Sequence, residues 1–413
     1  MNTDKQASDV VILGAARTPT GRFMGGLSSL SATDLGAIAV ETAVSRSGID
    51  PGSVYEVVLG NVISAGIGQA PARQAALRGG LPDTVGAMAV NKVCGSGLKA
   101  VMVAANGVIA GEAEVFVAGG MESMSNAPYL LPKARSGMRY GHGEVQDSLV
   151  TDGLWCSFQA WPMGNAAEFI ASQFNITRQE MDEFALRSHQ RAAEATANGR
   201  FAAEIVPVEV KSRKKTVTID IDEPIRATFS DGGYTMQTTL ESLGKLRPAF
   251  EKDGAVTAGN APSLNDGAAA MIVTSRAEAE RQGLQPMARI VGYTIAPVEP
   301  KWLFAAPARA VPKLLERVGW QMEDVDLFEL NEAFAAQCLA NGAELVQGGY
   351  PFTWDNVNVN GGAIALGHPL GASGARVLVT LLYALQDRGL RRGIAALCLG
   401  GGEAVAMAVE MEE

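Results

Sequence analysis

Two short stretches, Asn91-Lys-Val-Cys94-Gly-Ser-Gly97 and Gly361-Gly-Ala-Ile-Ala-Leu-Gly-His368-Pro369, decide the fold of this chain. Each is a glycine-rich turn that follows a short apolar segment and precedes a long apolar one. A strand, a tight turn and a helix explain this pattern in both places. The equivalence of the two turns indicates two related halves, one carrying a thiol and the other an imidazole.

Apolar segments around these turns repeat in the same order, at an offset of about 270–280 residues. The first half predicts helices and strands at 10–13 (strand), 34–47 (helix), 54–59 (strand), 69–78 (helix), 86–90 (strand), 98–110 (helix) and 115–118 (strand). The second half predicts the same series at 288–294, 308–318, 325–330, 332–346, 356–359, 372–386 and 394–399, with a last strand at 404–410. Residues 268–274 are the first-half counterpart of that last strand.

Strands that alternate with helices predict an α/β fold of mostly parallel sheets covered on both faces. The helix at 98–110 is apolar on nearly all sides, so we expect it to be buried between layers, as it would be in two sheets that share central helices.

The repeat is interrupted between Gly120 and Thr257, which indicates an inserted domain. A helix at 178–198 begins with a capping box of Thr177 and Glu180 and ends at Gly199. A hairpin follows, with strands at 206–210 and 216–221 and a basic tip at 211–215. The predicted division is an N-terminal core domain (1–120 plus 258–285), an inserted loop domain (121–257) and a C-terminal core domain (286–413).

Composition excludes several classes of function. The net charge of −10 and the lack of a long basic stretch argue against nucleic-acid binding. Four separated cysteines and only three histidines make a metal site improbable. No signal peptide and no membrane-spanning segment are evident, and the few cysteines suit a reducing compartment, so we expect a cytoplasmic protein without membrane insertion.

Cys94 and His368 are the first candidates for chemistry. A cysteine at a helix start meets unpaired backbone N–H groups and partial positive charge, which stabilise a thiolate. The alternative for Cys94 is a small buried thiol, and for His368 a histidine that only caps its turn. Their pairing through the repeat favours a nucleophile and its base, and therefore acyl chemistry through a thioester.

Cys398 and Asn331 lie at the ends of two further predicted strands. Cys398 precedes Gly400-Gly401-Gly402, whose backbone N–H groups can approach a substrate, although a buried inert thiol is an equal alternative. Asn331 lies where strand ends face the ligand crevice of an α/β sheet, and Asn61 holds the matching place in the first half. A helix cap is the alternative for Asn331. His189 lies in register with the apolar face of its helix and is most simply structural, and the Gly-His-Gly loop leaves the role of His142 open.

The chain resembles the thiolases of the acetyl-CoA acetyltransferase and 3-ketoacyl-CoA thiolase group. The resemblance runs along nearly the whole chain, on motifs in one order: Ala16-Arg-Thr-Pro-x-Gly-Arg-Phe23, Cys94-Gly-Ser-Gly-Leu-Lys-Ala, Gly119-Gly-Met-Glu-Ser-Met-Ser125, Thr257-Ala-Gly-Asn-Ala, Asn265-Asp-Gly-Ala-Ala, Asn331-Glu-Ala-Phe, Gly361-Gly-x-Ile-x-Leu-Gly-His-Pro and Cys398-Leu-Gly-Gly-Gly-Glu. It implies a five-layer αβαβα fold of two duplicated core domains with an inserted loop domain. It also implies a homo-oligomer in the tetrameric form and a place in fatty acid metabolism.

The resemblance implies a role for each candidate. Cys94 is the acylated nucleophile, His368 activates it and then helps to bind the thioester oxygen, and Cys398 exchanges the α-proton of the acetyl group. Asn331 holds a water in one oxyanion site, and the backbone N–H groups of Cys94 and Gly400 form the second. These roles match the physical needs of a covalently held acyl group, a stabilised enolate and a second base.

The resemblance also implies that acyl-CoA and coenzyme A are bound as substrates and that no cofactor or metal is needed. The positions expected to bind substrate or CoA are Arg226, Ser263, Met163 and Leu303. The chain departs from short-chain biosynthetic members at Pro162, at Pro262 and in the stretch from Leu303 to Pro307.

The expected reaction is condensation of two acetyl-CoA molecules to acetoacetyl-CoA or thiolytic cleavage of 3-ketoacyl-CoA, through an S-acyl-cysteine. The departures leave open a degradative thiolase for longer or functionalised 3-ketoacyl-CoA. A condensing synthase that uses acyl carrier protein is disfavoured, because Cys398 stands where such enzymes use a second histidine or an asparagine. From another class, a non-catalytic acyl-CoA- or lipid-binding relative stays possible.

Overall fold

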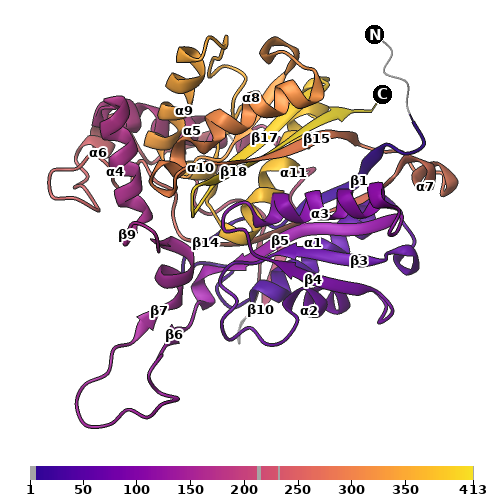
Figure 1. The fold of residues 1–413 in the computed structure, drawn as a ribbon, viewed down its shortest axis with the longest axis horizontal. Helices are drawn as coiled ribbons and strands as arrows, with labels where there is room; N and C mark the ends of the chain where they lie inside the picture. The colour runs from indigo at the N-terminus through magenta and orange to yellow at the C-terminus, as the bar shows by residue number, and fades with distance from the viewer. Residues whose placement is uncertain (1–5, 212–214, 231–232, 413) are drawn as a thin grey trace.

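The computed structural model describes residues 6–211, 215–230 and 233–412 and consists of two halves with the same strand order (Figure 1). The strands of the first half pair in the order β4 (Gly86–Val90), β3 (Glu56–Gly60), β5 (Val115–Ser123), β14 (Asn265–Ser275) and β1 (Val10–Arg17). Those of the second half pair in the order β16 (Leu327–Leu330), β17 (Arg392–Leu399), β18 (Glu403–Met411) and β15 (Ala288–Pro297). The duplication predicted from the two turns is therefore present in the strand order.

In each half, the strand that comes last in sequence is antiparallel to both of its neighbours in the sheet. β14 pairs antiparallel with β1 and β5, and β18 does so with β15 and β17, whereas the other strands of each half run in one direction. The sheet is therefore mixed, with the parallel strands expected from the alternating pattern in the majority.

The two halves form one hydrogen-bonded sheet and not the two separate sheets that the pattern suggested. β1 and β15 pair antiparallel at Val11–Arg289 and Ile12–Ala288. Each is the edge strand of its own half, and an edge strand presents unpaired N–H and C=O groups that a second edge can bind.

Each half of the sheet forms a layer of its own, so helices and sheet alternate in five layers, as expected for the αβαβα class. Helices α3 (Ser96–Ala110) and α11 (Leu370–Arg388) pack against the inner faces of both halves in a common core. The outer faces are covered by α1 (Ala32–Ser47) and α2 (Pro71–Arg78) in the first half, and by α8 (Ala306–Val318) and α9 (Ala335–Gln347) in the second. The stretch Val93–Ala110, with a mean hydropathy of 1.5, is long and apolar enough to cross a membrane, but here it contains the central core helix α3.

One predicted strand, at 356–359, is wrong. The segment makes only an isolated bridge at Val357 with Phe328 of β16, through two backbone hydrogen bonds. Its counterpart β4 pairs with β3 over five residues. Asn358 has a φ of 49°, which a continuous strand does not allow, so the ladder ends there.

The interrupted region carries short strands, the three helices α4, α5 and α6, a helical turn and extended loops. Its elements are β6 (Tyr129–Leu130), β7 (Gln146–Asp147), the helical turn Leu149–Leu154, β8 (Trp155–Cys156), β9 (Trp161–Pro162), α4 (Met163–Phe174), α5 (Arg178–Ala197), β10 (Val208–Lys211), β11 (Thr216–Ile219), β12 (Ala227–Ser230), β13 (Gly233–Met236) and α6 (Leu240–Gly244). Other short elements are β2 (Gly21–Arg22), α7 (Arg276–Arg281), α10 (Ala363–Leu366) and the helical turns Pro51–Ser53, Met124–Asn126, Pro300–Ala305 and Met322–Asp324. The capping box of Thr177 and Glu180 is confirmed.

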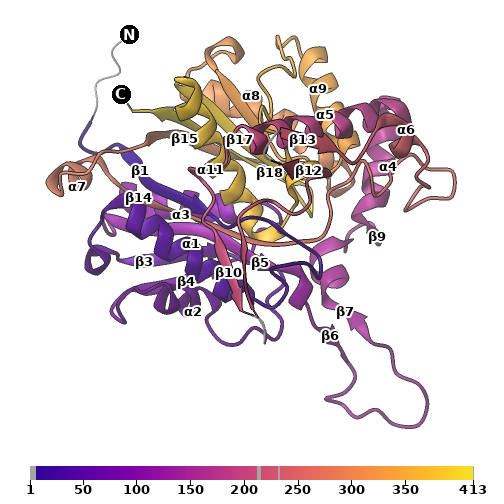
Figure 2. The same ribbon diagram turned by 180° about the vertical axis from the view of Figure 1, so that it is seen from behind.

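Two hairpins of this region, β10–β11 and β12–β13, lie against different halves (Figure 2). Val208 of β10 belongs to the core under α1, whereas β12 and β13 contact α5. The hairpin of β10 and β11 is confirmed, but residues 212–214 of its basic tip lie outside the described residues.

Candidate active site

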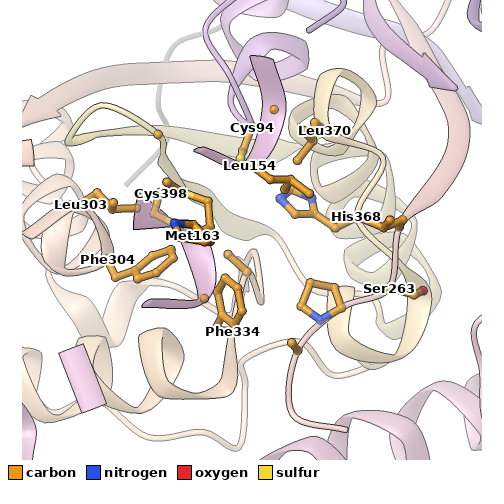
Figure 3. Close-up of a pocket in the computed structure, with 18 of the residues that line it drawn as sticks. Cys94, Leu154, Met163, Ser263, Leu303, Phe304, Phe334, His368, Leu370 and Cys398 are labelled. Carbon is orange, nitrogen blue, oxygen red and sulfur yellow. The ribbon is translucent and has the colours of Figure 1, made fainter. Parts of the chain in front are cut away.

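Cys94, His368 and Cys398 line one cavity of about 310 Å³, and their side chains point into it from three different elements (Figure 3). Cys94 comes from the turn before α3, His368 from the turn before α11 and Cys398 from the end of β17. These residues are separated by up to 304 positions in the chain. The structure therefore brings together the three side chains that the sequence singled out.

Close packing holds the Cys94 turn against side chains of β17 and β18. A Cβ on Gly95 would lie 2.2 Å from Leu399 Cδ2 and 2.8 Å from Val405 Cγ2, so a larger residue would have to displace these side chains. Val93 adopts a φ of 47°, an uncommon conformation for a β-branched residue. The neighbouring backbone N–H groups of Gly400 and of Cys94 itself approach the Cys94 sulfur. The site thus places two donors beside the atom that would carry an acyl group.

Burial outweighs the stabilisation of a Cys94 thiolate that was expected from the helix start. Burial raises the pKa of Cys94 to about 12, and the nearby Glu122 carboxylate adds to the rise. The donation by Gly400 N–H and Cys94 N–H lowers this pKa but does not offset the burial. Desolvation outweighs the helix start because Cys94 precedes Gly95, the cap residue, and lies at the cavity floor. The thiol is therefore un-ionised near neutral pH.

His368 is held by hydrogen bonds at its backbone and at its ring. Its N–H donates to Asn265 Oδ1 at 2.9 Å, and its Nδ1 lies 2.6 Å from Ser373 Oγ. Burial lowers the pKa of His368 to about 3, and the positive charge of Arg376 acts in the same direction. The imidazole is therefore neutral at pH 7 and can accept a proton.

Cys398 is buried beside Cys94 and precedes a turn that requires glycine. Gly401 and Gly402 adopt φ angles of 90° and 91°, and a Cβ on Gly402 would lie 2.7 Å from Pro300 Cα. Burial, and then the nearby Cys94, raises the pKa of Cys398 well above its ordinary value. A second neutral thiol thus lies beside the first.

Asn331 lies beside His368 and is not among the residues that line the cavity. It follows β16, as expected, and its Nδ2 lies 3.5 Å from His368 Nε2. The helix-cap alternative is wrong, because α9 begins after Phe334. Within the described residues its buried Oδ1 has no hydrogen-bond partner.

Three of the four residues expected to bind substrate lie on the cavity wall. Met163, Ser263 and Leu303 line the cavity, and Ser263 Oγ donates to Asn265 Oδ1 at 3.2 Å. Arg226 does not line it. Its Nη2 donates to the carbonyl oxygen of Ala258, and Arg22 is close enough to lower its pKa further after burial has done so.

The other two histidines lie apart from the cavity lining. His189 is buried, its Nδ1 accepts the N–H of Arg226 at 3.4 Å, and burial lowers its pKa to about 3. His142 is exposed. A structural role for His189 fits these contacts.

Sequence reasoning did not single out Glu122, which joins the two halves of the site. Its carboxylate accepts N–H groups from Val62, Ile63 and Gly371, and burial raises its pKa to about 7. The signal was available, because Glu122 lies in the quoted motif Gly119-Gly-Met-Glu-Ser-Met-Ser125. The aromatic wall of the cavity was also missed; it consists of Phe250, Phe304 and Phe334.

Metal ligands do not gather anywhere in the described part of the chain. Among residues 6–211, 215–230 and 233–412, no three His, Cys, Asp or Glu side chains are grouped so that they could hold a metal ion. The chemistry available to the cavity is that of two thiols, an imidazole and backbone donors.

Comparison with known proteins gives one consistent picture. The family profile "Thiolase, N-terminal domain" matches residues 10–277, and "Thiolase, C-terminal domain" matches residues 284–411. The chain is 52% identical over 401 residues to an acetyl-CoA acetyltransferase of Escherichia coli (strain K12), with 97% of this chain and 98% of that protein covered. It is 50% identical over 402 residues to one of Pseudomonas aeruginosa, with the same coverage.

A solved structure agrees with this similarity. The crystal structure of the Bacillus anthracis acetyl-CoA acetyltransferase superposes with a TM-score of 0.92 at 45% sequence identity. The match covers 98% of this chain and 99% of that one.

Proposed function

Because this chain belongs to the thiolase family, we propose that it is an acetyl-CoA acetyltransferase that joins two acetyl-CoA molecules into acetoacetyl-CoA through S-acetyl-Cys94. The observation that carries the proposal is the convergence of Cys94, His368 and Cys398 on one cavity. The reverse reaction, thiolytic cleavage of acetoacetyl-CoA, follows the same steps backwards.

In the first half-reaction, Cys94 Sγ attacks the thioester carbonyl carbon of acetyl-CoA. Its proton passes to His368, and the S–C bond to coenzyme A breaks. The leaving thiolate takes the proton from His368 and departs as coenzyme A. Because both Cys94 and His368 are neutral at rest, proton transfer accompanies the attack and does not precede it.

In the second half-reaction, Cys398 removes an α-proton from the second acetyl-CoA. The resulting enolate carbon attacks the carbonyl carbon of S-acetyl-Cys94, and the Cys94 sulfur leaves as a thiolate and is reprotonated. A buried thiol beside Cys94 is placed to serve as this second base. Because Cys398 starts as a neutral thiol with a raised pKa, its own proton first passes to His368, which is neutral again once coenzyme A has left. His368 then gives that proton to the Cys94 thiolate.

Two groups of donors support stabilisation of the negative oxygen atoms. The N–H groups of Cys94 and Gly400 lie beside the Cys94 sulfur and are aimed where the oxyanion of the acyl group forms. On the other side, Asn331 beside His368 Nε2 suits the role of holding a water that donates to the enolate oxygen.

Coenzyme A enters as a substrate, and we assign no cofactor. Ser263, Met163 and Leu303 line the route to Cys94, which fits the pantetheine arm and the acyl end. Arg226 and the nearby Arg22 place positive charge outside the cavity lining, which suits the phosphates of the nucleotide.

We also propose that the protein is a cytoplasmic homotetramer that serves fatty acid metabolism. Family membership supports this assembly, and so does the long hairpin of β6 and β7 that projects from the body (Figure 1). The hairpin exposes large apolar side chains: Tyr129, Leu131, Met138, Tyr140 and Val145. Exposed apolar surface of this kind is typical of an interface. The mass in solution from light scattering tests it, and a monomer at working concentration would contradict it.

The function is tested by mass spectrometry of the intact protein after it is mixed with acetyl-CoA. We expect one added acetyl group on Cys94 and release of one equivalent of coenzyme A, both absent in Cys94→Ala. A series of 3-ketoacyl-CoA substrates of increasing chain length then separates acetoacetyl-CoA preference from a degradative enzyme for longer chains. Absence of any acyl adduct on the wild-type protein would contradict the proposal.

A further inference from the structure

The ring of His368 is fixed by a residue that no catalytic role so far includes. Ser373 Oγ lies 2.6 Å from His368 Nδ1 and donates to the carbonyl oxygen of Pro369 at 2.8 Å. Ser373 is fully buried in the first turn of α11, and His368 is only 6% exposed. Solvent therefore cannot replace this contact easily.

The protons in this small network can be counted. A neutral imidazole carries one ring proton, and a serine hydroxyl carries one proton and two lone pairs. The carbonyl of Pro369 can only accept, and it already accepts the backbone N–H groups of Ala372 and Ser373. We assign the hydroxyl proton to this carbonyl as well, so that a lone pair of Ser373 Oγ receives the proton on Nδ1. Nε2 is then unprotonated, and it is the nitrogen that faces the amide of Asn331.

We propose that Ser373 is a positioning residue for the activation of Cys94, because it holds His368 in the tautomer whose Nε2 accepts the thiol proton. This inference rests on the proposed acyl transfer. Ser373 is not among the residues that line the cavity, and it acts through the imidazole.

The backbone next to the ring is fixed as well, so the Ser373 hydroxyl controls only the orientation and the tautomer of the ring. Asn265 Oδ1 accepts the N–H of His368, and Asn265 Nδ2 donates to the carbonyl of Gly21. Glu122 accepts the N–H of Gly371 at the start of α11. With the chain held on both sides, loss of the hydroxyl leaves the fold of the turn in place and frees the ring and its tautomer.

The test measures the burst of coenzyme A that is released when enzyme and acetyl-CoA are mixed. We expect Ser373→Ala to slow the burst by about 10–100-fold, by analogy with the loss seen when a partner that orients a metal-bound histidine is removed. KM for acetyl-CoA should stay within about twofold, since binding contacts are unchanged. Ser373→Thr keeps the hydroxyl and should recover most of the lost rate.

Thr380→Val is the matched control. Thr380 is a buried hydroxyl on the same helix and donates to Glu204 Oε1 at 3.2 Å, two turns away from Ser373. Thr380→Val should lose about as much thermal stability as Ser373→Ala but should keep the burst rate of the wild-type protein. A slow burst in both variants would show that Ser373 matters only for stability.

A spectroscopic readout tests the tautomer directly. The chain has three histidines, so protein labelled with ¹⁵N-histidine gives few ring signals, and His368→Asn identifies those of His368. We expect the wild-type proton on Nδ1 and a mixture of tautomers in Ser373→Ala. A wild-type proton on Nε2, or an unchanged burst in Ser373→Ala, would overturn the inference. If the wild-type protein releases no coenzyme A, the proposed function fails, and the ring signals still decide the tautomer.

Discussion

At the scale of single residues, the site combines reactive groups that are all neutral at rest. Burial raises the pKa of the Cys94 thiol to about 12 and lowers that of the His368 imidazole to about 3. A preformed thiolate–imidazolium pair would need the opposite shifts, with Cys94 lowered and His368 raised. The cavity therefore protects the thiol from side reactions until a thioester arrives and its developing oxyanion meets the N–H groups of Cys94 and Gly400.

The ionisation of Cys94 predicts its reaction with iodoacetamide. Only the thiolate reacts, and its fraction rises about tenfold per pH unit below the thiol pKa. Because that pKa lies at about 12, we expect the labelling rate of Cys94 to climb across pH 7 to 9 without a plateau, as measured on its peptide by mass spectrometry.

Labelling of the Cys94→Ala protein corrects for the other thiols, which are buried at Cys156, Cys338 and Cys398. A rate that levels off below pH 8 would contradict the neutral pair and indicate an ion pair with His368.

At the scale of helices and strands, two central helices carry the nucleophile and the base at their starts. α3 follows Cys94 and α11 follows His368. The two helices are in contact at a position where α3 has a glycine and therefore no side chain. A Cβ on Gly97 would lie 2.6 Å from the backbone nitrogen of Ala375 and 3.1 Å from the carbonyl of Gly371. The distance between the two helices therefore sets the relation of Cys94 to His368.

Gly97→Ala should separate these helices. We expect a loss of about 1–3 kcal/mol in unfolding free energy, the usual cost of overpacking, together with a slower coenzyme A burst. Urea unfolding and stopped-flow mixing measure the two effects.

Gly244→Ala is the control, because it lies at the end of α6 and no described atom comes within 4 Å of the new methyl group. It should change stability by less than about 0.5 kcal/mol. If Gly97→Ala changes the unfolding free energy and the burst no more than this control does, the close approach of the helices at Gly97 does not set the position of Cys94 relative to His368.

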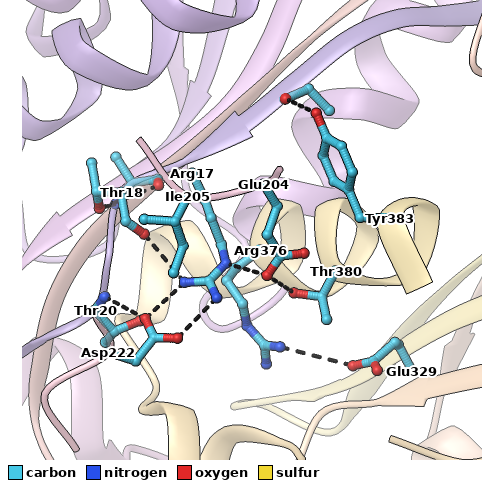
Figure 4. Close-up of polar contacts among 12 residues, drawn as sticks. Arg17, Thr18, Thr20, Glu204, Ile205, Asp222, Glu329, Arg376, Thr380 and Tyr383 are labelled. Carbon is cyan, nitrogen blue, oxygen red and sulfur yellow. Dashed lines mark hydrogen bonds and ion pairs between the residues drawn. The ribbon is translucent and has the colours of Figure 1, made fainter. Parts of the chain in front are cut away.

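At the scale of the whole molecule, a buried ionic cluster ties the interrupted region to the core (Figure 4). Arg17 of β1 pairs with Glu204 and Asp222, each at 2.7 Å, and all three side chains are almost completely buried. Arg376 of α11 lies 3.8 Å from Glu329 in the same cluster. Strand, central helix and inserted loops therefore meet at one set of charges, and the charge of Arg376 in this set also lowers the pKa of His368.

Arg17→Met should destabilise the protein by roughly 3–5 kcal/mol, because two buried carboxylates lose their partner. The measurement is urea-induced unfolding followed by circular dichroism. Arg78→Met is the control, since its ion pair with Asp34 is largely exposed and should contribute no more than about 1 kcal/mol. Equal losses in the two variants would contradict a special role for the buried cluster.

Particular residues show which parts of the fold could be predicted from the sequence. The apolar repeat predicted the order of nearly all strands and helices in both halves, because hydrophobic periodicity is a local signal. It missed the bend at Asn358, since a positive φ at a residue other than glycine leaves little trace in the sequence. The division into three domains at 120, 257 and 285 stays a prediction.

The sequence alone predicted the duplicated α/β architecture and the identity of the reactive side chains, because glycine-rich turns and apolar periodicity depend only on neighbouring residues in the chain. Only the tertiary structure decided their chemical state and their partners. Ser373 and Glu122 became relevant through contacts across the fold, and burial reversed the expected ionisation of Cys94. The physical reason is that desolvation depends on everything packed around a group, whereas the start of a helix depends only on its neighbours in the chain.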